Sequence, residues 1–348
     1  MNNKVTVKDI AKSLHVSIGT VDRALHNRPG IKEETLKLVL QKANELGYEA
    51  NKLAQSLSRK RKIKIGCIFP GQYRYFYPDL EAGILDASKS LVDHNVEVIC
   101  VKTEKLGFGP EISFIHKLLE QGIDGLAICP GHRTEMNHAI NKVTEHGIPV
   151  VTIATDAPES KRLTCVSTNS FNNGQIAGDL MANFMNHKGK VAIMTGSHEV
   201  TDHQEKVKGF FDVVYSFPNA IEMVGVFETL DRGERVYQAV TQVIKDHPDL
   251  KGIYINTANS VYGSKSVADS GKAGQIYLIG TDLLTENVPY IEDGTMQAVI
   301  YQDPYMQGYK AVQILYDTIT TGRQYGPNDY VKPDIVTKHN IHYFRCFS

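Results

Sequence analysis

The chain has 348 residues, of which 42% are hydrophobic and 22% charged, and its net charge at neutral pH is −1. This length exceeds one ordinary core, so two or three domains are expected, and no apolar run approaches the roughly 18 residues that cross a membrane. The N-terminus turns polar and helix-forming within a few residues, without the apolar core of a secretory signal. We therefore expect a cytoplasmic protein without membrane contact.

The near-neutral total hides an uneven distribution of charge. Residues 1–62 carry a net charge of +7 and the remainder a net charge of −8. A basic segment on an acidic body favours a polyanionic partner for that segment, although charge alone also fits a solvated surface. Five cysteines lie far apart, four of them in apolar runs, so buried free thiols are predicted rather than disulfides or a metal site. We expect no cofactor.

Three short amphipathic helices are predicted near the N-terminus, over residues 7–14, 18–25 and about 32–46. Thr6 and Asp9 have the spacing of a capping box for the first helix, and Ser17 is placed to cap the second. The third helix is expected to bury Leu36, Val39, Leu40 and Ala43. Two short helices across a tight turn, braced by a third, form a helix-turn-helix arrangement.

The second of these helices suits the major groove of DNA, where each base pair presents its own pattern of donors and acceptors. Its exposed start offers Ile18 and Gly19, and Arg23 is our candidate for contacting a guanine edge. The hydroxyls that suit phosphate contacts are those of Thr6, Ser17, Thr20 and Thr35. The alternative is a plain three-helix domain in which Arg23 makes a surface salt bridge.

Residues 1–62 resemble the DNA-binding head of the LacI/GalR family of bacterial regulators. The matching elements, in order, are T-x-x-D-I-A, V-S-x-x-T-V-x-R-A-L, the helix around Thr35, L-G-Y-x-x-N and L-A-x-x-L. Asp22 and Lys32 replace small polar residues that the family usually has, so no operator sequence carries over.

The resemblance implies that residues 1–50 are the DNA-binding domain and that residues 51–62 form a hinge helix. In the family, two hinge helices pair in the minor groove and a leucine is wedged between base steps; Leu57 holds the matching position. A basic linker that folds only on DNA is the alternative. The predicted DNA-contacting set is Thr6, Ser17, Ile18, Gly19, Thr20, Arg23, Asn27, Thr35, Asn51, Ala54 and Leu57.

From residue 63 onward, short apolar runs alternate with amphipathic segments. The predicted strands are 63–69, 96–101, 125–129, 149–154, 190–195, 222–227, 252–255, 275–280 and 296–301. The predicted helices are 79–93, 111–121, 135–146, 174–186, 204–215, 233–246 and 305–322. Buried strands joined by helical crossovers indicate parallel sheets covered on both faces. The expected fold is therefore an all-α head followed by two doubly wound α/β lobes.

Polar and aromatic residues follow the ends of several predicted strands, where ligands of such sheets bind. The candidates are Tyr75, Phe76, Asp156, Asn256, Thr257, Asp282 and Gln302. Carboxylates and amides around aromatic faces suit a sugar, because they accept hydrogen bonds from hydroxyls while the rings stack on C–H faces. The alternatives are that Asp156 and Asp282 cap turns or helices, that Gln302 bridges the lobes structurally, and that Tyr75, Phe76 and Tyr77 belong in part to a lid or a dimer surface. His132, His198 and His203 lack the spacing of metal ligands and are expected at the surface or at a pocket rim.

The order of these elements resembles the type I periplasmic-binding-protein-like sensor of the same family, closest to the ribose-binding type. The resemblance implies a first lobe of about residues 63–168 and 302–328 and a second lobe of about 169–301 and 329–348. It matches Tyr75 and Phe76 to stacking aromatic residues of that sensor.

The same resemblance matches Asp156, Asp282 and Gln302 to ligand-contacting residues. It matches Lys206 to an arginine and Thr257, beside Asn256, to an asparagine. Ala157 stands in place of the arginine that usually follows the aspartate. These substitutions argue against ribose itself and leave a pentose, a hexose or a sugar derivative.

The resemblance predicts a homodimeric, sequence-specific transcriptional regulator, expected to be a repressor. A small ligand, expected to be a sugar, would re-angle the lobes and so reset the spacing of two DNA-binding heads. A nucleobase or phosphosugar ligand remains an alternative. Alternatives of another class are a solute-binding protein, which leaves the basic head unexplained, and an enzyme on the same scaffold. The sequence carries no P-loop, no GxSxG and no GxGxxG after the first strand, so no enzyme is expected.

Overall fold

The computed structural model describes residues 5–25, 30–46, 62–71, 76–104, 108–132, 134–217 and 220–344. They belong to two compact units, Met1–Arg61 and Lys62–Ser348. The site predictions that lie outside the described residues are Asn27, Asn51, Ala54, Leu57 and Tyr75.

The N-terminal unit contains three helices, α1 (Val7–Leu14), α2 (Ile18–Leu25) and α3 (Glu33–Glu45), around one small core. The Asp9 carboxylate accepts hydrogen bonds from the backbone N–H of Thr6 at 2.8 Å and from its hydroxyl at 2.6 Å, so the predicted capping pair forms. Leu40 was predicted to be buried, and this is wrong: it is 47% exposed. The core of this unit takes in only the stripe of α3 that carries Val39 and Ala43.

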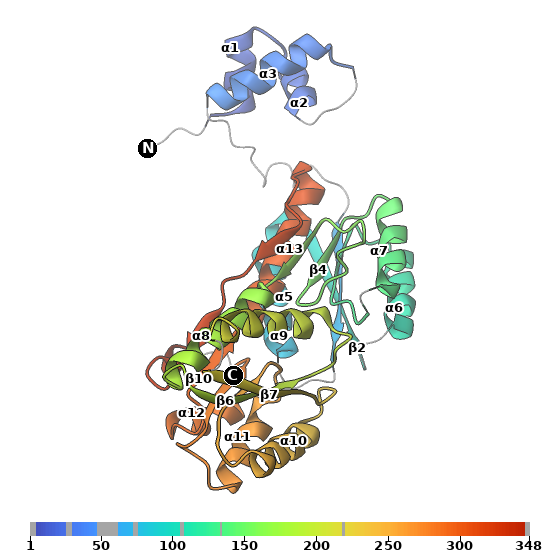
Figure 1. Ribbon diagram of the computed structural model, residues 1–348. Coiled ribbons are helices and arrows are strands. Elements are labelled where there is room, and N and C mark those ends of the chain that lie inside the picture. The colour runs from blue at the N-terminus through green and yellow to red at the C-terminus, as the bar shows by residue number, and fades with distance from the viewer. Residues whose placement is uncertain are drawn as a thin grey trace. The chain divides into compact units, whose positions relative to one another are not determined.

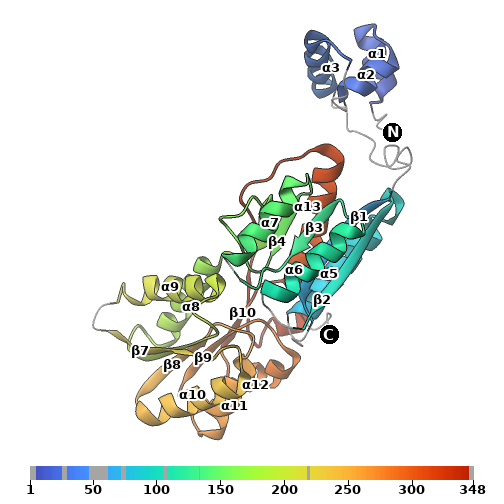
Figure 2. The ribbon, with the colours of Figure 1, turned by 90° about the vertical axis from the view of Figure 1, so that its right-hand side faces the viewer.

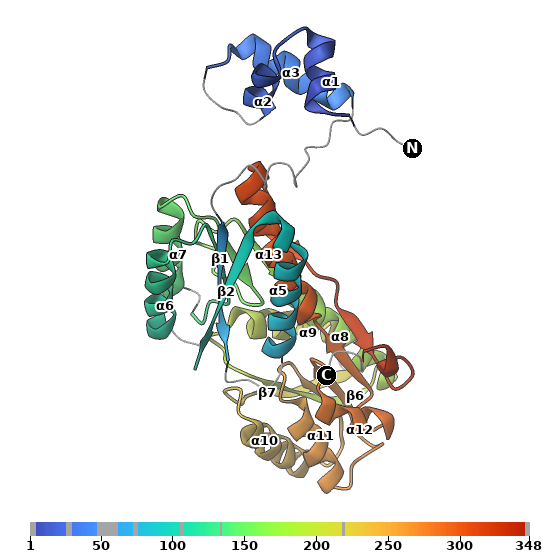
Figure 3. The ribbon, with the colours of Figure 1, turned by 180° about the vertical axis from the view of Figure 1, so that it is seen from behind.

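The second unit begins with a lobe built on a parallel sheet of strand order β11-β5-β4-β3-β1-β2. The strands are β1 (Ile63–Pro70), β2 (Val96–Thr103), β3 (Gly125–Ile128), β4 (Val150–Ile153), β5 (Thr164–Ser167) and β11 (Asn328–Tyr330). The helices are α5 (Tyr77–Ser90), α6 (Phe108–Glu120), α7 (Glu135–Glu145) and α13 (Pro304–Thr321). Figure 3 shows α6 and α7 on one side of the strands and α5 and α13 on the other.

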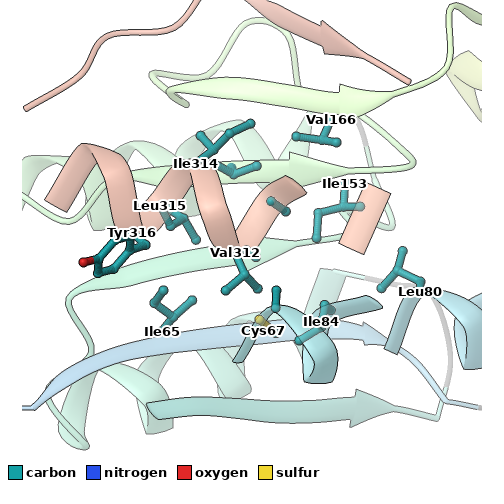
Figure 4. Close-up of a cluster of buried hydrophobic side chains, with 14 of the residues drawn as sticks. Ile65, Cys67, Leu80, Ile84, Ile153, Val166, Val312, Ile314, Leu315 and Tyr316 are labelled. Atoms are coloured by element: carbon teal, nitrogen blue, oxygen red, sulfur yellow. The ribbon is translucent and has the colours of Figure 1, made fainter. Parts of the chain in front are cut away.

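The core between the first sheet and the α5–α13 pair is aliphatic (Figure 4). Ile65 and Cys67 of β1 face Val312 and Leu315 of α13 across this layer. Apolar residues on both faces of the strands explain why the sequence has continuous rather than alternating hydrophobic runs here.

The second lobe has a sheet of order β12-β10-β9-β8-β6-β7, in which β12 alone is antiparallel to its neighbour. Its strands are β6 (Gly189–Thr195), β7 (Ile221–Glu228), β8 (Leu250–Ile255), β9 (Tyr277–Thr281), β10 (Ala298–Tyr301) and β12 (Asp334–Val336). Its helices are α8 (Ser170–Phe184), α9 (Thr201–Val214), α10 (Gly233–Asp246), α11 (Ser260–Asp269) and α12 (Val288–Glu292). Helices α8 and α9 cover one face, and α10 and α11 the other (Figure 2).

The predicted fold class is confirmed: a helical head precedes two doubly wound lobes (Figure 1). The chain passes between the lobes after β5, after β10 and after β11. The sequence placed the last passage near residue 328, whereas β11 pairs with β5 and therefore keeps Tyr330 in the first lobe. Strands β11 and β12 and helices α11 and α12 were not predicted from the sequence, because each is short or lacks a clear apolar stripe. Strand β5 was recognised only as the apolar run around Cys165.

Helices α8 and α9 pack backbone against backbone. A Cβ atom added at Gly174 would lie 2.0 Å from the carbonyl oxygen of Lys206, and one added at Gly209 would lie 1.9 Å from that of Phe171. Only glycine permits this approach. The contact holds Lys206 at a fixed place on the lobe.

Two further properties bear on the class of protein. No helix within the described ranges is both long and apolar enough to cross a bilayer. Cys67, Cys129 and Cys165 are buried free thiols, and Cys100 is a half-buried free thiol.

Candidate functional site

A cavity of about 400 Å³ lies between the two lobes of the second unit. The first lobe contributes Phe76 and Tyr77 at the start of α5, Thr155 after β4 and Gln307 in α13. In both sheets the strand order reverses beside the first strand of the lobe, β1 or β6, and the ends of the strands at such a reversal are where doubly wound sheets bind ligands.

The second lobe contributes most of the polar wall. Its polar side chains follow the carboxyl ends of parallel strands, which meet at one edge of the sheet, and they are Asp202, His203, Lys206, Asp231, Asn256, Thr257, Asn259 and Asp282. Gln302 lies where the chain leaves β10 for the first lobe, so it belongs to the passage between the lobes.

The structure brings together six of the predicted ligand-binding residues on the cavity wall: Phe76, Lys206, Asn256, Thr257, Asp282 and Gln302. Asp156 is not part of this wall. Its carboxylate forms a bidentate ion pair with Arg162, whose side chain is 6% exposed, and the Nη2–Oδ2 distance is 2.5 Å. Its Oδ1 also accepts from the hydroxyl of Thr152 and the N–H of Ala157. This arrangement favours the alternative in which Asp156 holds a turn.

Lys206 and Asp202 form a buried ion pair at the base of α9. The Lys206 Nζ donates to Asp202 Oδ2 at 2.7 Å, and Lys206 is only 1% exposed. The hydroxyl of Ser170 donates to the other Asp202 oxygen at 2.6 Å. Burial raises the pKa of Asp202, but the charges of Lys206 and His203 and these hydrogen bonds outweigh it and leave that pKa below its ordinary value. Lys206 is therefore committed to a protein carboxylate.

Asp282 is a carboxyl group of the cavity wall that is only 6% exposed. Burial raises its pKa from 3.8 to about 6, against the charge of Lys206 and a hydrogen bond from Gln302, both of which lower it. Gln302 Nε2 donates to Asp282 Oδ1 at 2.9 Å, and Oδ2 has no hydrogen-bond partner among the described residues. The residue has a left-handed backbone with φ of 63°.

Gln302 is oriented by hydrogen bonds at both ends of its amide. While Nε2 donates to Asp282, Oε1 accepts from the Thr168 hydroxyl at 3.1 Å and from Asn173 Nδ2 at 3.3 Å. Thr168 follows β5 on another passage between the lobes. The network thus links a cavity carboxylate to two interlobe passages.

Several cavity residues escaped the sequence analysis. Asp202 had a usable signal, since it lies four residues before Lys206 on a helix and opposite charges at this spacing pair readily. Asp231 and Tyr262 follow turns and carried no such signal, and His203 was expected at the surface or at a pocket rim. Within the described ranges, no three His, Cys, Asp or Glu side chains gather as metal ligands.

The N-terminal unit presents the start of α2 to solvent. Ser17, Ile18, Gly19 and Arg23 are all exposed, Ile18 by 50%. Ser17 Oγ accepts from the backbone N–H of Thr20 at 3.0 Å, so it caps α2 as predicted. Thr6 is also exposed, while Thr20 and Thr35 are half-buried.

Gly19 is not required by the packing of this unit. A Cβ atom there would approach no atom closer than 3.8 Å, an ordinary van der Waals contact. Glycine near the start of a helix carries a cost in stability relative to alanine. An exposed glycine beside Ile18 and Arg23 is therefore typical of a surface that another backbone or a groove approaches closely.

Comparison with known proteins agrees with both halves of this description. Residues 6–51 match the lacI family of bacterial regulatory proteins, and residues 65–324 match the periplasmic binding protein domain. The chain belongs to the family of the periplasmic binding protein domain, whose match covers most of its length, and its N-terminal unit carries the shorter lacI match. Its second unit is a periplasmic binding protein domain, and a ligand-controlled transcriptional regulator is the function that these matches support.

Among the relatives of the chain, catabolite control protein A of Priestia megaterium is 28% identical over 59% of the chain and 60% of the relative. The ribose operon repressor of Halalkalibacterium halodurans is 24% identical over 76% of the chain and 75% of the relative. The first of these alignments thus spans less than two thirds of the relative. The solved structure of GanP, a glucose-galactose binding protein from Geobacillus stearothermophilus, has a TM-score of 0.74 and 27% identity, covering 81% of the chain and 99% of GanP.

Proposed function

We propose that this regulator is a cytoplasmic homodimer, that it represses genes by binding operator DNA, and that a sugar in the interlobe cavity releases it. The proposal that the ligand is a sugar rests on the chemistry of the cavity wall. Asp231, Asp282 and Asn256 present oxygens that accept hydrogen bonds, and Phe76 and Tyr77 lie opposite on the other lobe. Hydroxyls are donors to such oxygens, and the C–H faces of a sugar stack on aromatic rings.

A phosphosugar fits this wall less well. Binding a phosphate usually takes arginine forks or free backbone N–H groups at a helix N-terminus. No arginine is among the residues that line the cavity within the described ranges, and its one lysine, Lys206, is paired with Asp202. The carboxylates of Asp231 and Asp282 would repel an anion. GanP, similar in fold and sequence, is named for two neutral hexoses.

The DNA-binding proposal rests on the exposed start of α2 and on the basic charge of residues 1–62. Arg23 supplies a planar donor pair for a guanine edge, and Ser17 supplies a hydroxyl for a phosphate. A dimer presents two such helices at a fixed spacing, so a change in the lobes that alters the spacing alters operator affinity. By linkage, operator DNA must change sugar affinity by the same factor.

Two measurements on the full chain test the proposal. Calorimetry against neutral monosaccharides, their phosphates and purines should give heat with a neutral sugar. Fluorescence anisotropy with duplexes selected from fragments of the organism's own genome should show specific binding that this sugar weakens.

The results separate the parts of the proposal. If a purine or a phosphosugar binds more tightly than every neutral sugar, a neutral sugar is excluded as the effector. Indifference to all selected duplexes at low salt would exclude the regulator, whatever the cavity binds. Analytical ultracentrifugation that finds a monomer at working concentrations would exclude the homodimer.

A further inference from the structure

The charges on the cavity wall do not balance. Of the ionisable side chains there, Lys206 and Asp202 neutralise each other in their ion pair. Asp282 feels the charge of Lys206 and accepts a hydrogen bond from Gln302. Asp231 remains, and no other lining residue within the described ranges supplies it with a counter-charge beyond the imidazole of His203. A carboxylate that lines a partly enclosed cavity loses part of its hydration, and this favours a ligand that brings positive charge to Asp231.

Asp231 is the carboxylate best placed to meet a ligand. It lines the cavity, is half-buried, and has neither a hydrogen bond nor an ion pair among the described residues. A Cβ atom added at Gly196 would lie 2.7 Å from its Oδ1 and 2.3 Å from the His203 ring. Glycine at position 196 therefore leaves room for both side chains against the backbone. The carboxylate is positioned by packing and not by a partner of its own.

The amides of the wall also present oxygens. Asn256 Nδ2 donates to the carbonyl oxygen of His203, and Gln307 Nε2 donates to that of Gln302, so each amide has its nitrogen engaged. Asn256 Oδ1 and Gln307 Oε1 find no hydrogen-bond partner in the part of the chain that the structure describes, although the two residues are 0% and 1% exposed. His203 Nδ1 accepts from the N–H of Ser197. A ligand for this wall is therefore rich in donors.

We infer that the effector is an amino sugar whose ammonium group binds the Asp231 carboxylate, while its hydroxyls donate to Asp282 and to the amide oxygens. This inference rests on the proposed function, and it narrows the sugar to one that carries a positive charge. The ammonium group supplies three donors and the charge that the wall lacks. A neutral hexose supplies the hydroxyl donors and leaves Asp231 without a counter-ion.

Matched pairs of ligands test the charge by itself. Calorimetry at pH 7 compares glucose, galactose and mannose with their 2-amino-2-deoxy forms and with the N-acetylated amines, which keep the nitrogen and lose the charge. At least one amino sugar should bind ten times more tightly than its parent hexose, a difference of about 1.4 kcal/mol. Its N-acetylated form should not show this gain.

The Asp231→Asn substitution tests whether the Asp231 carboxylate binds the ammonium group. Because Asp231 has no partner in the free protein, the substitution should leave the melting temperature unchanged while it lowers amino-sugar affinity about tenfold. Affinity for the parent hexose should fall by a clearly smaller factor, because asparagine keeps one oxygen that accepts from a hydroxyl. The control is Glu234→Gln, the same change of charge three residues away, on an exposed side chain outside the cavity. Glu234→Gln should change the affinity for neither the amino sugar nor the parent hexose.

Failure of this inference is distinct from failure of sugar sensing. If a parent hexose binds as tightly as its amine, or if Asp231→Asn weakens both equally, the inference is overturned and sugar sensing stands. If neither the neutral nor the amino sugars give heat, both the inference and sugar sensing are refuted. A simple diamine such as putrescine that binds where every amino sugar fails would also overturn the inference.

Discussion

Replacing Asp282 with asparagine should stabilise the free protein at neutral pH, although the residue lines the proposed binding site. Asp282 is 6% exposed, and burial raises its pKa from 3.8 to about 6. A shift of about two units corresponds to about 3 kcal/mol lost from folding when the carboxyl is ionised. Asparagine keeps an oxygen that accepts the hydrogen bond from Gln302 and carries no charge to bury. Ligand affinity should fall, because the ionised acceptor is gone.

The pH dependence has a definite sign. A carboxyl group whose pKa is raised in the folded state binds its proton more tightly there than in the unfolded chain. The wild-type protein therefore loses stability as pH rises from the unfolded pKa near 3.8 to the folded pKa of about 6, and the loss is complete above that. The advantage of Asp282→Asn should be small at pH 4 and reach about 3 kcal/mol at pH 7.5.

Urea unfolding of the full chain, followed by far-ultraviolet circular dichroism at four pH values between 4 and 7.5, measures this difference. Asp202→Asn is the matched control. The pKa of Asp202 is lowered, so its ionised form stabilises the fold above the unfolded pKa, and its replacement should destabilise the protein at pH 7.5. The reasoning would be refuted if the Asp282→Asn protein were less stable than wild type at pH 7.5. It would also be refuted if the gain in free energy of unfolding over wild type were as large at pH 4 as at pH 7.5.

Three further substitutions address the other predicted residues. Gly19→Ala should stabilise the N-terminal unit by about 0.5–1 kcal/mol in thermal unfolding and weaken operator binding in anisotropy; unchanged DNA affinity would contradict a close approach at α2. Asp156→Asn should lower stability by about 2 kcal/mol through its lost pairing with Arg162 and leave the sugar dissociation constant unchanged, whereas a large loss of sugar affinity would restore Asp156 as a ligand contact. Leu57→Ala should weaken specific DNA binding and spare sugar binding, and unaltered operator affinity would reject the wedge.

Hydrophobic patterns in the sequence predict the strands and the residues that directly follow them. Buried runs located most strands of both lobes, and Asp282 and Gln302 were found because each comes after such a run. The cavity role of Asp231 depends on which loops the two lobes bring together, and that is not a local property of the chain. Likewise, the partner of Asp156 could not be chosen from the sequence, since both a ligand and Arg162 satisfy the same carboxylate.

Short strands were missed for a related reason. The three-residue strands β11 and β12 exist because distant strands, β5 and β10, offer them free edges. Their own residues have no continuous apolar run, since only one face of an edge strand packs tightly. Leu40 shows the opposite error, in which an apolar residue at helical spacing was assigned to a core too small to reach it.

The hydrogen bonds around Gln302 give ligand binding a route to the lobe angle. Asn173 is fully buried in α8 and lies outside the cavity wall. Its Nδ2 donates to the Thr168 hydroxyl at 2.7 Å and to Gln302 Oε1 at 3.3 Å, so it ties two interlobe passages together. Gln302 in turn holds Asp282. A ligand that binds Asp282 therefore contacts a side chain whose hydrogen bonds lead to both interlobe passages.

Asn173→Ala should uncouple the two ends of this route. We expect sugar affinity in the absence of DNA to change less than about threefold, since no ligand contact is removed, while the factor by which sugar weakens operator binding falls toward one. The measurement is operator affinity with and without saturating sugar. Asn183→Ala is the control, because Asn183 lies on the same helix and, among the described residues, its amide nitrogen donates only to the carbonyl oxygen of Asp179. Equal coupling in wild type and Asn173→Ala would mean that the passages transmit the signal without this network.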